Sequence, residues 1–293
     1  MSGLRIEGVI DMHCHYGPDL VNVSAGPGHG AHVTALDAAR EARDSGHRAI
    51  VLKSHSLPSP TLAHAIEEAT PGLRVFGGAC TDYPSGGLNP DMVEACLKLG
   101  GKIIWLPTLH SHQDYLNGMG ERTGIKGEGL TVTDEDGEPS EVVREIFALV
   151  RENDAVLATG HVTAAEHFAV AKAFAREGKV LVTHAGEHLA GPKLTAQQCR
   201  ELADLGAVIE LTALSCQAVF GTQGKSPEEM AKMMGHVGCE RCALATDYGW
   251  SATDIPHPAP GFRDFMETLW SLGVSEADLT TMAARNPARL LGL

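Results

Sequence analysis

Histidine is frequent in this chain, with 15 among 293 residues, and seven of these residues follow short apolar segments. The seven are His13, His15, His55, His110, His112, His161 and His184. Asp247 follows another apolar segment in the same way. Neutral imidazole is the commonest metal ligand in proteins, and imidazole also serves acid–base chemistry. If these segments end at one place in the fold, the pattern indicates a metal or acid–base site.

His13 and His15 have the spacing of two ligands on one strand. Successive side chains of a strand alternate, so these two point to one side and Cys14 points to the other. A His-x-His pair on one face chelates metal ions well, and the carboxylate of Asp247 would add negative charge. A single histidine at a strand end is usually a structural residue. A metal site is favoured here because four histidines (His13, His15, His161 and His184) and Asp247 follow predicted strands of the same barrel.

Eight short apolar segments, which alternate with helical patterns, must position these residues. We predict the strands Glu7–Met12, Arg48–Leu52, Leu73–Gly77, Lys102–Leu106, Ala155–Thr159, Lys179–Thr183, Ala207–Leu211 and Ala243–Thr246. Each is almost continuously apolar, which is typical of parallel strands covered on both faces. Capping-box patterns at Thr163–Glu166, Thr195–Gln198 and Ser226–Glu229 predict helix starts between them.

Eight strands that alternate with helices predict a single α/β domain over residues 1–293, a (β/α)8 TIM barrel. A doubly wound open sheet is the main alternative, but no glycine-rich phosphate-binding motif follows the first predicted strand. Two connections are longer than a barrel requires, Tyr16–Val33 after the first strand and His110–Pro139 after the fourth. Both leave the ends of strands where barrel enzymes build their sites, so we expect them to shape a substrate site. Simple surface decoration is the alternative.

The composition excludes several classes of partner. Lys and Arg number 23 against 37 Asp and Glu, a net charge of −14, and no basic block is present. Such a chain repels nucleic acid and anionic lipid, and no apolar segment approaches the roughly 18 residues of a membrane span. The N-terminal sequence lacks signal-peptide features, and seven irregularly spaced cysteines suit a reducing compartment. We therefore expect a cytoplasmic protein that acts on a small molecule; a homo-oligomer is compatible with the sequence.

Taken in order, these motifs resemble those of the amidohydrolase superfamily. Asp11-Met12-His13-Cys14-His15, His161, His184 and Asp247 end the first, fifth, sixth and eighth predicted strands, and Asn286–Leu293 is similar to the closing helix of those enzymes. The resemblance spans the whole chain and implies a metal-dependent barrel. The segments His13–Asp19 and Leu52–His55 look closest to an uncharacterised branch, so the resemblance implies no particular substrate.

The resemblance implies a ligand set and a reaction class. His13, His15 and Asp247 would surround one metal ion, with His161 and His184 around a second or shared ion. Most members hydrolyse amide, ester, lactone or ring C–N bonds, while some are deaminases, decarboxylases or hydratases. We expect one or two Zn²⁺ ions to activate a water, with Asp247 as the general base; Mn²⁺, Fe²⁺ and Ni²⁺ also suit these ligands. A metal-dependent lyase and a non-catalytic binding barrel are the alternatives.

Lys53 departs from the pattern of the superfamily. The fourth predicted strand has no lysine at the position where a carbamylated lysine usually bridges two metal ions, and Lys53, which follows the second strand, is the obvious substitute. A buried charged lysine is costly, so it should be neutralised, paired or modified. Three interpretations stay open: a metal-bridging carbamate, an unmodified lysine that binds an anionic substrate, and a structural ion pair.

Several further residues are candidates for the rim of the site. We predict substrate contacts for Tyr16, His55, His110 and His112, with Asp19 and Asp82 as further candidates. Arg122 or Lys126 could join Lys53 in balancing an acidic substrate. The Cys239-Glu-Arg-Cys242 motif lacks a second cysteine pair, and we interpret it as structural.

Overall fold

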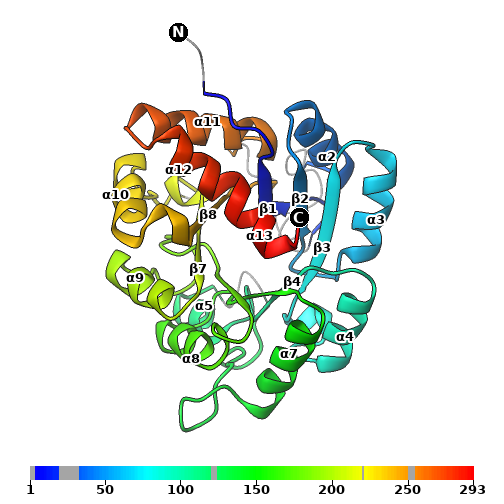
Figure 1. Ribbon diagram of the computed structural model, residues 1–293. Coiled ribbons are helices and arrows are strands. Elements are labelled where there is room, and N and C mark those ends of the chain that lie inside the picture. Colours follow the sequence, from blue (N-terminus) through cyan, green and yellow to red (C-terminus); the bar gives the residue numbers. More distant parts are fainter. Residues whose placement is uncertain (1–3, 20–32, 120–123, 220, 250–254) are drawn as a thin grey trace.

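The strands of this computed structural model follow one another around a single closed sheet (Figure 1). The structure describes residues 4–19, 33–119, 124–219, 221–249 and 255–293. Each strand pairs in parallel with the next, from the first to the eighth. The barrel closes where the His15 N–H donates to the Tyr248 carbonyl at 2.8 Å and the Asp247 N–H donates to the His13 carbonyl at 2.9 Å. The predicted (β/α)8 barrel is therefore confirmed.

All eight predicted strands are present, with shifted ends. They are β1 (Ile10–His15), β2 (Ala49–Lys53), β3 (Arg74–Cys80), β4 (Ile103–Trp105), β5 (Val156–Ala158), β6 (Lys179–Val182), β7 (Val208–Thr212) and β8 (Cys242–Ala245). The largest shift is in β1, which starts and ends three residues later than predicted. Its last residue, His15, pairs with Lys53 of β2. His13 and His15 therefore belong to the strand itself rather than to the loop after it.

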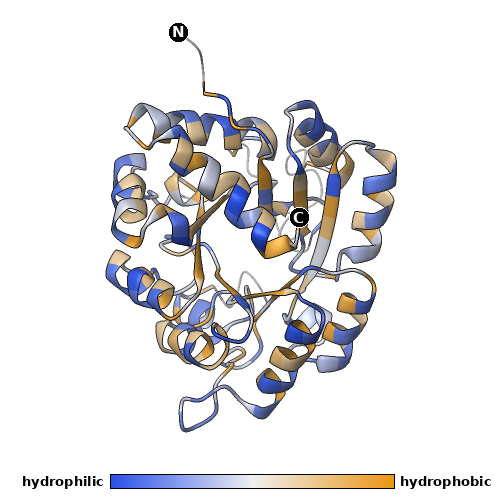
Figure 2. Ribbon diagram, viewed as in Figure 1, coloured by the Kyte–Doolittle hydropathy of each residue, from blue (hydrophilic) through white to orange (hydrophobic). Residues whose placement is uncertain are grey.

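Helices cover the outside of the barrel and connect the strands. They include α2 (Ala35–Asp44), α3 (Pro60–Ala69), α4 (Pro90–Lys98), α5 (His112–Leu116), α7 (Glu141–Glu152), α8 (Ala164–Phe174), α9 (Ala196–Asp204), α10 (Pro227–Val237), α11 (Pro258–Ser271), α12 (Glu276–Thr280) and α13 (Asn286–Leu291). The predicted capping boxes at the starts of α8, α9 and α10 are all formed. In Figure 2 the strands are mostly hydrophobic, while hydrophilic segments concentrate on the helices. No helix in the described ranges combines the length and the apolar character of a transmembrane segment.

Helix α13 closes the end of the barrel at which the strands begin. Leu290 and Leu291 belong to the apolar cluster inside the barrel, together with Ile10 of β1 and Val208 of β7. The Asn286 side chain donates to the carbonyls of Cys239, Glu240 and Cys242, the last at 2.7 Å. In Figure 1 this helix lies across the centre of the barrel. The Asn286–Leu293 motif thus holds an apolar plug.

The two long loops are described only in part. Most of the Tyr16–Val33 connection lies outside the described residues; at its ends the Gly17 N–H donates to the Val33 carbonyl at 2.8 Å. The described part of the loop after β4 contains α5 and an antiparallel bridge between Thr133 and Pro139. Both loops leave the end of the barrel opposite α13.

Candidate metal centre and active site

An irregularity in β1 brings two consecutive side chains toward the barrel interior. Asp11 pairs with Ile50 and Cys14 with Leu52, so β1 holds one residue more than β2 between these pairs. Met12 joins the apolar interior cluster, while the buried His13 ring lies 6.2 Å from the ring of Trp105, centroid to centroid. Bulges of this kind redirect side chains at functional sites. Here the bulge places His13 directly above the apolar interior.

His13, His15 and Asp247 form a compact, buried group of three potential metal donors. The two Nε2 atoms lie 3.2 Å apart, and Asp247 Oδ1 lies 3.1 Å from His13 Nε2 and 3.0 Å from His15 Nε2. Asp247 has a left-handed backbone with φ of 58°. Gly249 follows with φ of 114°, and a Cβ at this position would lie 1.9 Å from the His15 carbonyl oxygen. The sequence after β8 is therefore shaped for close contact with β1.

His161 and His184 form a second pair beside this group. Their Nε2 atoms lie 2.9 Å apart, and the ring centroids of His13 and His184 are separated by 5.7 Å. His184 has an unusual φ of 23° for a residue with a side chain. Gly160, just before His161, has a φ of 68° and approaches the Leu106 carbonyl too closely for any Cβ. Residues in such conformations cluster at functional sites, because the surrounding structure must hold them.

Buried carboxylates orient one histidine of each group. Glu210 Oε2 lies 3.0 Å from His13 Nδ1, and Asp114 Oδ2 lies 2.6 Å from His161 Nδ1. A carboxylate at this distance accepts a hydrogen from Nδ1, so Nε2 of each ring presents its lone pair to the interior. The lone pairs of His13 and His161 then face the Nε2 atoms of His15 and His184. A divalent cation fits this set of converging acceptors.

The charges of the first group are tightly coupled. Burial alone would raise the pKa of the Asp247 carboxyl, but the adjacent His13 and the hydrogen bonds with both histidines hold it well below its usual range. Burial opposes the charged form of His13, yet Asp247 and Glu210 raise its pKa to about 9. Burial lowers the pKa of His15 to about 3. Without a cation, a protonated His13 thus balances Asp247, and a metal ion would compete with that proton.

Lys53 reaches the same place from the end of β2. The side chain is 1% exposed, with Nζ 2.9 Å from His13 Nε2 and 5.6 Å from the centre of the Trp105 ring. In the described part of the chain no carboxylate forms an ion pair with it. This arrangement gives no support to a structural ion pair, and it agrees with either of the other two interpretations.

A second buried network borders the metal-ligand group. Asp82 accepts from the N–H groups of Thr108 and His110, at 2.9 and 3.1 Å, and from the Thr108 hydroxyl. His55 Nδ1 lies 2.7 Å from Thr108 Oγ1, and the His55 ring stacks on His15 with centroids 5.0 Å apart. Burial would raise the pKa of the Asp82 carboxyl, but the adjacent side chains of His110 and His55 hold it below its usual range. The predicted substrate residues His55 and His110 are thus brought together by one carboxylate.

Other predicted rim residues have different surroundings. Tyr16 packs in an apolar cluster with Ala35 and Leu52, and burial raises its pKa to about 12. His112 begins α5, and its Nδ1 lies 2.7 Å from the Glu128 carbonyl oxygen. The described contacts therefore join neither Tyr16 nor His112 to the metal-ligand group, and their substrate roles stay predictions.

The structure describes Asp19 and Lys126, two further candidates for the rim of the site. Asp19 accepts from the His55 N–H at 2.9 Å and from Ser56 Oγ at 2.5 Å, which ties the first loop to the second. The Lys126 carbonyl accepts from the Tyr83 hydroxyl at 2.9 Å. Arg122 lies outside the described residues. The Lys126 and Arg122 predictions therefore stay open.

Sequence reasoning missed Glu210 and Asp114. Both are fully buried. Glu210 stands alone as a charged residue inside the apolar strand prediction Ala207–Leu211, and that contrast was its available signal. Asp114 lies in the first turn of α5, where an acidic residue is ordinary, so nothing in the sequence distinguished it.

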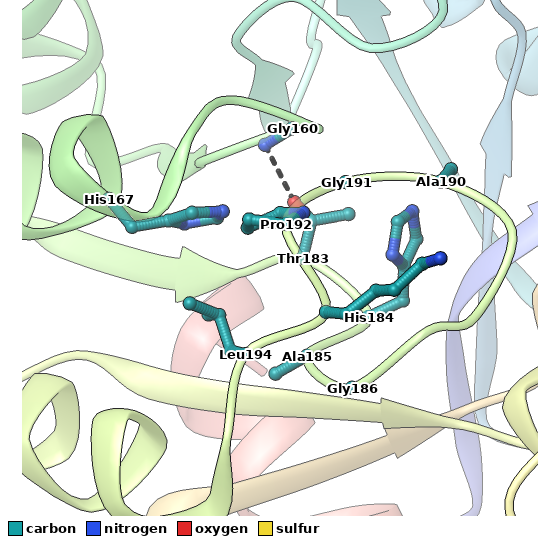
Figure 3. A pocket seen from close by; sticks show the side chains of 11 residues that line it. Gly160, His167, Thr183, His184, Ala185, Gly186, Ala190, Gly191, Pro192 and Leu194 are labelled. Atoms are coloured by element: carbon teal, nitrogen blue, oxygen red, sulfur yellow. Dashed lines mark hydrogen bonds between the residues drawn. The ribbon is translucent and has the colours of Figure 1, made fainter. Parts of the chain in front are cut away.

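A small pocket lies beside His184, between α8 and the loop after β6 (Figure 3). Its empty volume, which includes space open to solvent, is about 190 Å³. Gly160 N–H donates to Thr183 Oγ1 at 2.8 Å across it, and the ring nitrogens of His167 have no hydrogen-bond partner in the described part of the chain. The pocket is a neighbour of the metal-ligand group rather than a substrate cavity.

Comparison with solved structures shows the same fold over nearly the whole chain. An amidohydrolase from Pseudomonas aeruginosa has 14% identity and a TM-score of 0.60, covering 97% of this chain and 95% of that chain. A metallo peptidase from Rhodobacter sphaeroides has 14% identity and a TM-score of 0.63, covering 98% and 99%. A 2,6-dihydroxybenzoate decarboxylase has 13% identity and a TM-score of 0.60, covering 98% and 100%. These likenesses show that the chain shares the barrel fold of these three proteins.

Sequence comparison is less specific about function. Residues 8–210 match the model of a family described as "Family of unknown function (DUF6282)". A comparison with curated proteins gives no match to the sequence. The matched segment includes β1 to β6 and most of β7, and so contains all the residues described above as metal donors except Asp247.

Proposed function

We propose that this chain, which belongs to the Family of unknown function (DUF6282), is a metal-dependent hydrolase. Its substrate would be a small molecule with an amide, lactone, ester or cyclic C–N bond. The observation that carries the proposal is the convergence of His13, His15 and Asp247, with donor atoms 3.0 to 3.2 Å apart at the open end of the barrel. The likeness to a metallo peptidase and to an amidohydrolase supports it.

The chain's own residues would divide the work of hydrolysis. His13, His15, Asp247, His161 and His184 would hold one or two divalent ions, which polarise the scissile carbonyl and lower the pKa of a water. Asp247 accepts the proton of the attacking water at its carboxylate and passes it to the leaving group. The Asp247 carboxyl is ionised at neutral pH, as a proton acceptor must be, although its low pKa by itself makes it a weak base.

His55 and His110 would orient the substrate, since Asp82 fixes the positions of both. His55 is held between Asp19 and Thr108, so its ring has a defined direction beside His15. Substrate contacts of Tyr16 and His112 belong to the proposal as well, through the two long loops.

Zn²⁺ is the ion that we propose, since imidazole and carboxylate are its usual ligands; Mn²⁺, Fe²⁺ and Ni²⁺ suit the same donors. For Lys53 we propose a carbamate, because an ammonium group 2.9 Å from His13 Nε2 would repel a cation held by that atom. A carbamate replaces the positive charge with negative oxygen donors. ¹³C NMR after growth with ¹³C-labelled bicarbonate tests this: an unmodified Lys53, without a carbamate signal, favours binding of an anionic substrate group instead.

A metal-dependent lyase is the second candidate. The likeness to a 2,6-dihydroxybenzoate decarboxylase favours it, because a decarboxylase or hydratase can use the same barrel and ligand types. A non-catalytic barrel that only binds a small molecule is the third. We place the protein in the cytoplasm, acting on a small molecule rather than on nucleic acid or membranes; self-association into a homo-oligomer is compatible with the proposal.

Turnover of a substrate panel tests the proposal. The full chain, loaded with Zn²⁺ or Mn²⁺, is assayed against lactones, amides, esters and aromatic carboxylic acids, with a chelator-treated sample as the control. Metal-dependent release of hydrolysis products supports the hydrolase. Release of CO₂ from the carboxylic acids, without hydrolysis of the other compounds, would replace it with the lyase. Tight metal binding without any turnover would favour the binding barrel.

A further inference from the structure

Glu210 is a buried carboxylate that contacts both groups of histidines. It lies on β7, with no exposed surface, and its Oε2 lies 3.0 Å from His13 Nδ1. The same oxygen accepts a hydrogen bond from the His184 backbone N–H at 2.9 Å. The Glu210 carbonyl accepts from the next N–H, that of Ala185, also at 2.9 Å. One residue thus joins the ends of β1 and β6 from the strand adjacent to β6.

Burial of the Glu210 carboxylate at this position destabilises the folded state. The other carboxylate oxygen, Oε1, is buried and has no hydrogen-bond partner in the described part of the chain. A buried polar atom without a partner destabilises the folded state, more so when it carries charge. An apolar residue would fill the same place in the strand without that penalty. The penalty indicates that the carboxylate has a use other than stability.

The contact with His13 determines which nitrogen of that ring can bind a metal ion. Hydrogen-bond acceptance by Glu210 places the hydrogen on Nδ1 and leaves the lone pair on Nε2. That Nε2 atom is the one near His15 and Asp247. Without the carboxylate, His13 could carry its hydrogen on Nε2 and would then offer no lone pair to the group.

The contact with His184 acts on the backbone. His184 has a φ of 23°, a conformation that residues with side chains rarely adopt. The two hydrogen bonds to Glu210 hold this part of the chain, and they direct Nε2 of His184 to within 2.9 Å of His161 Nε2. Loss of the carboxylate would remove the first of these two hydrogen bonds, that of the His184 N–H, and so loosen the backbone that aims this ring.

We propose that Glu210 is a positioning residue shared by the two metal-ligand groups, so that its loss weakens metal binding at both. The inference rests on the metal site of the proposed function. Asp114 offers a matched comparison, because it contacts the His161 ring at 2.6 Å and the Gly191 N–H at 2.9 Å but touches neither His13 nor the His184 backbone. Asp114 therefore supports one group, whereas Glu210 supports both.

Co²⁺ titration of the full-length chain tests the difference. Affinity is measured by competition with a chromogenic chelator, and ligand geometry by the visible absorption of bound Co²⁺, for the unaltered chain, Glu210→Gln and Asp114→Asn. Loss of a residue that orients a metal-binding histidine typically weakens metal affinity about 10- to 100-fold. We expect Glu210→Gln to weaken every Co²⁺ equivalent to that degree and to alter the whole spectrum. Asp114→Asn should weaken one equivalent, or a single shared ion to a smaller degree.

Other results would overturn the inference. If both Glu210→Gln, whose amide oxygen can still accept these hydrogen bonds, and Glu210→Asp bind Co²⁺ with unchanged affinity and spectrum, Glu210 has no positioning role, even when the unfolding free energy changes. Failure of the unaltered chain to bind Co²⁺ or Zn²⁺ would overturn the proposed function and this inference together. If Glu210→Gln does not fold, Glu210→Asp is the variant to measure. Its shorter side chain keeps the negative charge but cannot reach His13 and the His184 N–H. A Co²⁺ affinity equal to that of the unaltered chain would then contradict the proposal.

Discussion

The two ends of this barrel differ in the side chains that fill them: one is apolar, and the other contains histidines and carboxylates. At the end where the strands begin, Leu290 and Leu291 of α13 fill the interior among aliphatic side chains. At the other end, His13 and His184 lie over the same interior and are held by the buried carboxylate of Glu210. The first end gains stability from apolar burial. At the second end, buried polar groups and unusual backbone conformations lower the stability of the folded state.

The comparison predicts that the two ends respond differently to mutation. Changes near α13 should alter the free energy of unfolding and leave metal binding unaffected. Changes among the histidines and carboxylates should alter metal binding or turnover. Weaker metal binding after a change near α13, or unchanged metal binding and turnover after changes among the histidines and carboxylates, would contradict this division.

The largest effect is expected for Asp247→Asn. The amide keeps an oxygen near His13 and His15 but cannot accept the proton of the attacking water, so turnover should fall by about 10²- to 10⁴-fold. The measurement is kcat on whichever panel substrate the unaltered chain hydrolyses, with metal content determined alongside. Metal content should stay largely intact; an active Asn variant would remove Asp247 from the role of base.

The next effect concerns the apolar end. Leu290 is 2% exposed inside the barrel, so Leu290→Ala should destabilise the fold by about 2 to 5 kcal/mol through lost burial and the cavity left behind. Urea unfolding with chelator present measures it. Co²⁺ affinity of the folded variant serves as the control, and a tenfold loss of that affinity would show that the two ends are coupled.

A pH effect should also appear near the beginning of the strands. His47 precedes β2, neither ring nitrogen has a hydrogen-bond partner in the described residues, and burial lowers its pKa from 6.5 to about 4. The unfolded chain therefore binds the proton more readily, so the stability from His47 is present above pH 6.5 and is lost as pH falls toward 4. This difference corresponds to about 3 kcal/mol.

Urea unfolding at pH 7.5 and pH 4, on the unaltered chain and on His47→Gln, measures that loss. The chelator keeps metal ions from contributing to either value. The variant should lose less stability between the two pH values than the unaltered chain does. Equal losses would mean that His47 is protonated or hydrated in the folded protein.

The smallest effect is expected outside the barrel. Ser226 caps α10 and forms a complete capping box with Glu229. Ser226→Ala should cost about 1 kcal/mol of unfolding free energy. Thr163→Ala at the start of α8 is the matched variant, since the same box forms there. A change in Co²⁺ affinity for Ser226→Ala would contradict the assignment of metal binding to the open end alone.

The sequence was sufficient for the fold because each strand is a distinct apolar segment and the helix caps are local patterns. It misplaced the end of β1, since His13 and His15 are polar and resemble the start of a loop, while the bulge depends on pairing with β2. It also missed Glu210, whose contact with His13 joins residues 197 positions apart. The single charge within an apolar strand marks Glu210 as unusual, but its partners depend on the closed barrel and cannot be read from the local sequence.

The side-chain directions of the predicted rim residues could not be read from the sequence for the same reason. His55 and His110 share one partner, Asp82, whereas Tyr16 packs among apolar side chains and His112 contacts the Glu128 carbonyl; the predicted substrate roles of all four stay predictions. A position after a strand places a residue near the open end of the barrel. The direction of its side chain depends on loop packing, and that packing involves contacts distant in the sequence.

The most direct test of the account is a crystal structure of the Zn²⁺-loaded chain with anomalous scattering recorded at the zinc edge. The account predicts a strong anomalous peak bound by His13, His15 and Asp247, with His161 and His184 around the same ion or a neighbouring one. A peak at another place, or zinc absent from these residues at saturating concentration, would contradict it.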